Sequence, residues 1–125
     1  MNLLLDTHVF LWMLSSPERL NSRVAARLRD PRNSVFVSAI SSVEIAIKRG
    51  LGKLQAPDNL SLQIEKRGLL ELPFQYRHGE TLSSLPPHHA DPFDRMLIAQ
   101  AVVEELTLVT HDRKMEPYPI HCLWT

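Results

Sequence analysis

Short, wholly apolar runs recur along the chain and predict buried strands. The first run, residues 3–5, consists of three consecutive leucines and is typical of a strand that is covered on both faces. Runs of similar length predict further strands over residues 34–39, 69–72, 106–110 and 120–124.

Between these runs, apolar residues recur at helical spacing and are bounded by residues that cap helices. Ser41 can cap one helix that Gly50 ends, and Asp91-Pro92 opens the longest one. The expected helices are residues 9–14, a helix capped by Asn21 or Ser22 that ends at residue 29, 41–50, a helix from 58 or 59 to 68, 79–85 and 93–105.

Strands that alternate with helices indicate βαβ units, in which a mostly parallel sheet carries helices on both faces. The chain has 125 residues, about the length of one domain, and contains no repeat, low-complexity tract or long linker. We therefore expect an α/β fold of three layers, with residues 1–125 forming one domain.

Composition narrows the class of protein further. Apolar residues make up 44% and charged residues 22%, which excludes a disordered chain or a disulfide scaffold. No apolar run approaches the roughly 20 residues that cross a bilayer, and the opening MNLLLD lacks the basic segment of a secretory signal. The single cysteine, Cys122, cannot form an internal disulfide, and we expect it to pack in the core. These features favour a cytoplasmic protein with no membrane partner.

Two acids follow predicted strands closely. Asp6 comes directly after the first strand, and Asp112 follows the run that ends at Thr110. Ligands of open α/β sheets bind outside the carboxyl ends of the strands. We therefore expect Asp6 and Asp112 on the functional edge of one sheet.

Two further acids lie on apolar helix faces. Glu44 lies in the apolar stripe of its helix, and Asp94 leads the inward-facing row of the longest helix. Each acid also has a structural alternative: Asp6 and Asp94 as helix caps, Asp112 as a turn residue, and Glu44 as a side chain that reaches solvent. Their convergence on one edge favours a shared role.

Converging carboxylates repel one another and require a compensating cation. The sequence shows no matching cluster of buried Lys or Arg, and no Cys/His spacing for zinc. Mg²⁺ or Mn²⁺ fits an all-carboxylate site and suits metal-assisted hydrolysis of a phosphodiester. Fourteen basic side chains balance fourteen acidic ones, so gathering four acids in one site leaves a surface of net charge +4, which suits a polyanionic substrate.

Four segments carry a resemblance to a known family: LLLDTHVFLW, SAISSVEIAIKRGLGKL, LPPHHADPFDRMLIAQA and LVTHDRKMEPYPIHCLW. In this order they resemble the PIN-domain ribonucleases, most closely the VapC-type toxins of type II toxin–antitoxin pairs, and residues 54–80 are the least informative. The resemblance implies a PIN-like fold and a Mg²⁺- or Mn²⁺-dependent endoribonuclease. It also implies a homodimer that is held by a cognate antitoxin.

The resemblance implies roles for individual residues as well. The acids of the family fall on Asp6, Glu44, Asp94 and Asp112, as metal ligands and catalytic residues, with Asp112 at the least constant position. Asp91 is either a ligand through water or only a helix cap. The residues expected to orient ligands or contact RNA around these acids are Thr7, Thr110, Asp91, Arg95 and Arg113, with Lys114 beside them.

The histidines and tryptophans are less specific. For the adjacent His88 and His89 we favour structural or substrate contacts over a metal site, because neighbouring residues seldom point to one centre. His8 and His111 lie beside Asp6 and Asp112, so contact with RNA is more plausible for them than metal ligation. Trp12 is expected in the core.

Two other functions fit parts of the sequence. A phosphoacceptor receiver module shares the small fold, the acids and Mg²⁺, but it requires paired acids at the first strand, where Asp6 has no acidic neighbour. An RNA-binding protein that does not cleave is the other alternative.

Two surfaces are expected to meet protein partners. For a homodimer we expect a self-complementary patch from part of residues 9–14 together with 45–54, and the alternative is that residues 9–14 all lie in the core. For an antitoxin we expect a basic side chain to enter the cluster of Asp6, Glu44 and Asp94.

Overall fold

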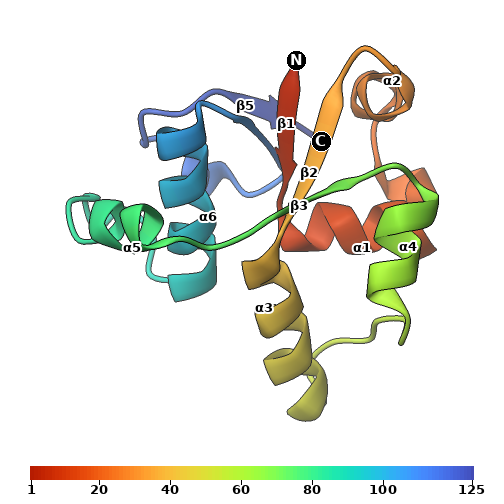
Figure 1. Ribbon diagram of the computed structural model, residues 1–125, viewed down its shortest axis with the longest axis horizontal. Helices are drawn as coiled ribbons and strands as arrows, with labels where there is room; N and C mark the ends of the chain where they lie inside the picture. Colours follow the sequence, from red (N-terminus) through yellow and green to blue (C-terminus); the bar gives the residue numbers. More distant parts are fainter.

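The computed structural model describes residues 1–125, and a single five-stranded sheet runs through it (Figure 1). The strand order is β3-β2-β1-β4-β5 and every pairing is parallel, which confirms the expected α/β fold. The strands are β1 (Asn2–Leu5), β2 (Ser34–Ser38), β3 (Leu70–Leu72), β4 (Thr107–Thr110) and β5 (Cys122–Trp124).

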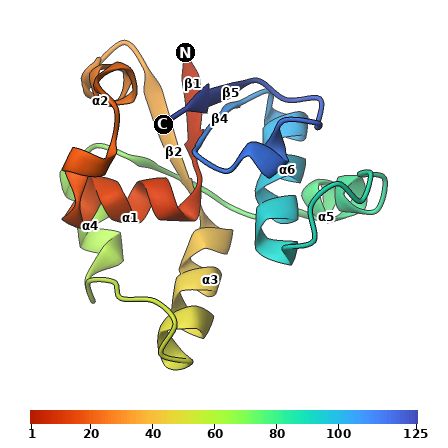
Figure 2. The same cartoon turned by 180° about the vertical axis from the view of Figure 1, so that it is seen from behind.

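Helices cover both faces of the sheet, as expected, with α1, α2 and α4 on one face and α5 and α6 on the other (Figures 1 and 2). The helix α3 leaves the carboxyl end of β2 and contacts both α1 and α6. The α-helices are α1 (Thr7–Ser15), α2 (Ser22–Arg29), α3 (Ala39–Gly50), α4 (Leu60–Lys66), α5 (Tyr76–Leu82) and α6 (Pro92–Glu104), and two short 3₁₀ helices span Pro17–Arg19 and Arg113–Met115. None of the helices has the length and apolarity that a membrane-spanning segment requires.

The first strand supplies both hydrophobic cores. Leu3 and Leu5 belong to the core beneath α1, whereas Leu4 belongs to the core beneath α6. All three side chains are fully buried, because successive residues of a strand point to opposite faces and both faces are covered. The three leucines therefore form the centre of the molecule.

Several helices begin earlier than the sequence predicts, and the starts of α3 and α5 have identifiable causes. The N-cap of α3 is Ser38, whose hydroxyl accepts a hydrogen bond from the N–H of Ile40, so the helix starts before the expected cap Ser41. The helix α5 starts at Tyr76 because Gln75 and His78 form a reciprocal capping box, with the N–H of Gln75 donating to Nδ1 of His78. A Gln/His pair lies outside the usual Ser/Thr signal, which explains the missed start.

Much of the expected dimer patch lies in the core instead of on the surface. Val9, Phe10 and Leu11, on the inner face of α1, are at most 7% exposed and belong to the core, so the core alternative holds for these three residues. Trp12, which was expected in the core, is only partly buried. The helix α1 therefore turns its most apolar face inward and leaves the tryptophan at the margin of the core.

The strand order places the functional edge. The chain passes from β1 to β2 and β3 in one direction and returns to the other side of β1 with β4. The carboxyl ends of β1 and β4 therefore lie at a topological switch point, where open α/β sheets bind their ligands. Asp6 and Asp112 follow these two strands.

Candidate metal centre

Asp6 links the start of α1 to the end of β4. Its Oδ1 accepts hydrogen bonds from the backbone N–H groups of His8 (2.7 Å) and Val9 (3.4 Å), so Asp6 is the N-cap of α1. Its Oδ2 accepts a bond from the Thr110 hydroxyl (2.6 Å), which is the orienting contact expected of this threonine. Asp6 is 3% exposed, and a carboxylate can still offer further lone pairs to a cation. Capping and membership of the site are thus compatible.

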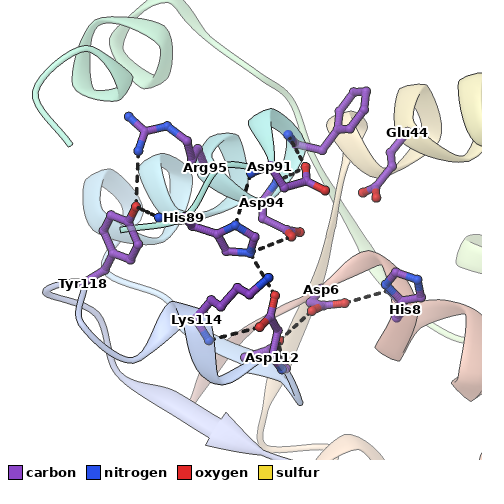
Figure 3. A network of polar contacts seen from close by, with 12 residues as sticks. Asp6, His8, Glu44, His89, Asp91, Asp94, Arg95, Asp112, Lys114 and Tyr118 are labelled. Carbon is purple, nitrogen blue, oxygen red and sulfur yellow. Dashed lines mark hydrogen bonds and ion pairs between the residues drawn. The ribbon is translucent and has the colours of Figure 1, made fainter. Parts of the chain in front are cut away.

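Asp91 starts α6 and positions Asp94. The Oδ1 of Asp91 accepts hydrogen bonds from the N–H groups of Phe93 (2.8 Å) and Asp94 (3.2 Å), and Pro92 occupies the first turn. Asp94 lies in the same turn and points toward the end of β4 (Figure 3). The hydrogen bonds of Asp91 therefore agree with the helix-cap alternative.

The environment of Asp94 strongly favours its protonated form. Burial, together with repulsion by nearby carboxylates, raises the pKa of Asp94 from 3.8 to about 8. The repelling groups are Asp91, Asp6, Glu44 and Asp112. The acids thus converge as the sequence predicted, and their convergence makes the ionised form of Asp94 costly.

His89 connects Asp94 to Asp112. Its Nε2 lies 2.8 Å from Oδ2 of Asp112 and 3.0 Å from Oδ2 of Asp94, and its Nδ1 accepts the N–H of Asp91 at 3.2 Å (Figure 3). Because Nδ1 accepts a bond, the ring proton sits on Nε2, which donates to Asp112, while Oδ2 of Asp94 lies close to the same nitrogen. His88 instead packs its ring against Tyr118, with centroids 5.4 Å apart. The two neighbouring histidines therefore point to different places, and only one reaches the acids.

Asp112 has the opposite electrostatic environment from Asp94. Burial alone raises the pKa of Asp112, but hydrogen bonds from the N–H of Lys114 (3.0 Å) and from His89 outweigh it, so the pKa lies below 3.8. Asp112 also caps the 3₁₀ helix Arg113–Met115, which accounts for its turn-like position. Asp94 and Asp112 form a pair of acids whose pKa values are pushed apart, an arrangement common in catalytic sites.

Lys48 compensates Glu44, a pairing that was not among the contacts expected from the sequence. Glu44 is 1% exposed on α3, and its Oε2 pairs with Lys48 Nζ at 2.5 Å, while Oε1 is buried without a hydrogen-bond partner. Lys48 Nζ also lies 3.7 Å from Oδ2 of Asp91. Burial lowers the pKa of Lys48, but these acids outweigh burial and raise it above 10.5. The i,i+4 spacing of Glu44 and Lys48 was the available signal.

An open cavity of about 590 Å³ gathers most of these groups. It is lined by Asp6, His8, His89, Ala90, Asp91, Asp94, His111, Asp112, Arg113 and Lys114. Three of the four predicted acids therefore face one space, with two basic side chains at its margin, and Glu44 lies outside this lining.

Three residues expected around the acids make other contacts. Thr7 shares a hydrogen bond with the Ser41 hydroxyl at 2.9 Å instead of orienting a carboxylate. The guanidinium of Arg95 turns away from the acids and donates to the carbonyl of Pro86 (2.9 Å) and to the Tyr118 hydroxyl (3.2 Å), which corrects its expected phosphate contact (Figure 3). Arg113 lines the cavity, but its guanidinium lies 4.1 Å from the ring centroid of Trp124.

The donor set suits a hard divalent cation. Asp94 and Asp112, with His89, offer ligand atoms that lie within 4.8 Å of one another, and Asp6 faces the same cavity. A cation there would offset the charge repulsion that raises the pKa of Asp94, and oxygen ligands match Mg²⁺ or Mn²⁺. To bind a cation through Nε2, the neutral ring of His89 would have to carry its proton on Nδ1, which would end the hydrogen bond from the N–H of Asp91.

The fold and the site together define an α/β domain that carries an acidic site at the switch point of a parallel sheet. Sequence similarity identifies the family. The PIN-domain model matches residues 3–119. The chain belongs to the PIN-domain family. This membership leaves the receiver-module alternative without support. None of the curated protein sequences matches the chain.

Solved structures share the fold over the whole chain. A chain of the DNA-bound VapBC structure from Salmonella typhimurium is 19% identical, with 98% of this chain and 97% of that chain covered and a TM-score of 0.72. For VapBC2 from Rickettsia felis, bound to a promoter DNA fragment, the identity is 17%, both chains are 98% covered and the TM-score is 0.68. For FitAcB from Neisseria gonorrhoeae the values are 22%, 97% and 96% covered, and 0.62. The chain therefore shares its fold with chains of the VapBC and FitAcB structures, and the PIN-like fold that the resemblance implied is confirmed.

Proposed function

We propose that this protein is a metal-dependent endoribonuclease and the toxin of a toxin–antitoxin pair. The observation that carries the proposal is the convergence of Asp6, Asp94 and Asp112 on one cavity, where burial and mutual repulsion raise the pKa of Asp94 to about 8. Membership of the PIN-domain family supports a nuclease of the toxin type. Carboxylates in such an arrangement favour a bound Mg²⁺ or Mn²⁺, because the cation offsets their mutual repulsion.

The residues divide the work of phosphodiester hydrolysis among them. Asp6, Asp94 and Asp112 would hold the cation. Glu44, on α3, pairs with Lys48 and would serve as a further acid of the site. When bound, the cation supplies Lewis acidity to the phosphate and charge that stabilises the leaving oxygen. Thr110 fixes the carboxylate of Asp6, and His89 fixes those of Asp94 and Asp112. Lys114, at the margin of the cavity, contacts the phosphate backbone of RNA.

The test compares metal-dependent RNA cleavage by the wild-type chain and by Asp94→Asn. Cleavage by the wild type should cease with a chelator and return with Mg²⁺ or Mn²⁺, whereas the variant should stay inactive. Asp30→Asn is the matched control, because Asp30 pairs with Arg32 away from the cavity. RNA binding without cleavage by the wild type in the presence of metal would favour the non-cleaving alternative.

An exposed stripe on α3 supports a homodimer. Val43, Ile47 and Leu51 are 45%, 47% and 64% exposed and recur every four residues, so they form one apolar row on the surface. Only the second part of the expected patch, residues 45–54, contributes to it. We propose that a second copy of the chain covers this row. Light scattering that shows a monomer at tens of micromolar would contradict the dimer.

The acidic cavity also suits an antitoxin side chain. Lys48 already bridges Glu44 and Asp91, which illustrates how an ammonium group fits among these carboxylates. The solved structures that share the fold include a toxin–antitoxin complex from Klebsiella pneumoniae, and we propose that a basic residue of a cognate antitoxin enters the cavity here. Neutralising that residue should weaken inhibition much more than binding. Equal inhibition would show that the antitoxin blocks access without entering.

A further inference from the structure

A second open cavity, also of about 590 Å³, adjoins the acidic one. It lies between α1, the 3₁₀ helix Pro17–Arg19 and residues 54–57, and its lining includes Trp12 and Arg19. His8 lines both cavities. The two spaces are therefore neighbours along one surface, and a chain that leaves the acidic cavity past His8 enters the second.

Trp12 is the centre of an aromatic and cationic group in this second cavity. The Cζ of Arg19 lies 4.7 Å from the centroid of the Trp12 ring. The ring centroid of His111 lies 4.8 Å from that of Trp12, with the two rings tilted by 57°. The ring centroid of His8 lies 6.4 Å from that of Trp12, with a tilt of 52°. His111 itself lines the acidic cavity. Trp12 is thus connected to the acids through two histidines, each of which sits within two residues of Asp6 or Asp112.

These groups match the chemistry of a nucleobase. Every base has a flat π-face that stacks on an aromatic ring or an Arg guanidinium, and single-stranded RNA exposes such faces. Trp12 follows Asp6 by six residues of one helix, which places it about 9 Å farther along the helix axis. A base that flanks a phosphate held by the acids is therefore within reach of the tryptophan.

We propose that this cavity is a base-binding subsite, in which a nucleotide next to the scissile phosphate stacks on Trp12 and is covered by Arg19. The inference rests on the proposed ribonuclease function, because it takes the acidic cavity as the place of the phosphate. Arg19 is exposed, so its guanidinium can leave the ring and close over the base. The cavity is polar as well as aromatic, with Ser15, Ser16 and Gln55 in its lining, which favours a base over an apolar peptide side chain.

The direct test uses the fluorescence of Trp12. The chain has two tryptophans, so Trp124→Phe leaves Trp12 as the only one, and Asp94→Asn in the same chain prevents cleavage. Short single-stranded RNA should quench the emission of Trp12 in the presence of Mg²⁺, and an abasic oligonucleotide of the same length should not. Fluorescence anisotropy of labelled RNA reports binding independently. Binding without base-dependent quenching, or no binding at all, would overturn the subsite.

Cleavage kinetics give a second readout with the Asp94 side chain intact. Trp12→Leu should raise KM at least about fivefold, the lower limit for loss of one stacked base, with kcat little changed, whereas Trp12→Phe should retain most of the affinity. Arg19→Gln should raise KM more than Arg23→Gln, which removes an exposed arginine that lines neither cavity. Circular dichroism checks that Trp12→Leu folds, and Trp12→Phe with the quenching experiment serves if it does not.

The outcomes separate the subsite from the function on which it rests. If base binding quenches the emission of Trp12 but the wild-type chain never cleaves RNA, the ribonuclease function is refuted and the base subsite stands. Cleavage with unchanged KM in Trp12→Leu would refute the subsite and keep the ribonuclease. If Trp12→Leu instead weakens only the complex with the antitoxin, the cavity belongs to the antitoxin and the proposal fails.

Discussion

Replacing Asp94 by Asn should stabilise the metal-free protein, and the gain should grow with pH. The wild-type carboxyl has a pKa of about 8 in the folded protein, against 3.8 as its ordinary value. Below about pH 4 it is protonated in both the folded and the unfolded chain. Between about pH 4 and 8 only the unfolded chain loses the proton, so the free energy of unfolding falls as pH rises. An asparagine carries no such proton.

The magnitude follows from the size of the pKa difference. A shift of roughly 4 pH units corresponds to about 1.4 kcal/mol per unit, so the penalty reaches at most about 6 kcal/mol above pH 8. That is a large share of the roughly 5–15 kcal/mol that holds a domain folded. The variant should therefore be about as stable as the wild type near pH 4 and several kcal/mol more stable at pH 8.

Urea denaturation with a chelator, repeated from pH 4 to 8, measures this difference directly. Asp30→Asn is the control, because a hydrogen bond from Arg32 lowers the pKa of Asp30 to about 2; its carboxylate stabilises the fold above pH 4, and that contribution is lost as pH falls. The two variants should thus deviate from the wild type in opposite directions at neutral pH. Parallel pH profiles for Asp94→Asn and the wild type would refute the account of the site as a cluster of repelling acids.

Three further changes test neighbouring contacts. Lys48→Gln should lower the free energy of unfolding by about 3 kcal/mol, because it leaves the buried carboxylate of Glu44 without its cation, and a second change, Glu44→Gln, should restore most of it in urea denaturation. His89→Ala should raise the pKa of Asp112, since a hydrogen bond to its ionised form is lost; carboxyl NMR titration of the metal-free protein that shows no rise would contradict the assigned donor. Ile47→Asp should convert dimers to monomers in light scattering, whereas a dimer that persists would place the interface elsewhere.

The acids were predictable because local patterns fix their positions. Asp6 and Asp112 follow apolar strands, and Asp94 starts an apolar helix, so a parallel sheet must bring them to one edge. The partners of these acids were not predictable in the same way. Lys48 is a long side chain whose direction no strand or helix pattern specifies, although its spacing from Glu44 was a hint.

Adjacent residues proved the hardest to assign from sequence. Arg95 follows Asp94, yet successive helix residues point about 100° apart, and the guanidinium reaches the Pro86 carbonyl on another side. His88 and His89 lie in a loop that points them apart, one to Tyr118 and one to the acids. The position of Arg95 next to Asp94 therefore suggested a phosphate contact that its guanidinium does not face. The position of His89 next to His88 concealed that His89 alone reaches the acids.

The hydrogen bond between Asp6 and Thr110 joins residues 104 positions apart. Because β1 pairs with β2 on one side and β4 on the other, the central strand gains its second partner only after all the residues between them have been synthesised. A nascent or truncated chain thus has Asp6 and Glu44 without Asp94 and Asp112. The acidic cavity can therefore form only after residues as far as Lys114 have left the ribosome.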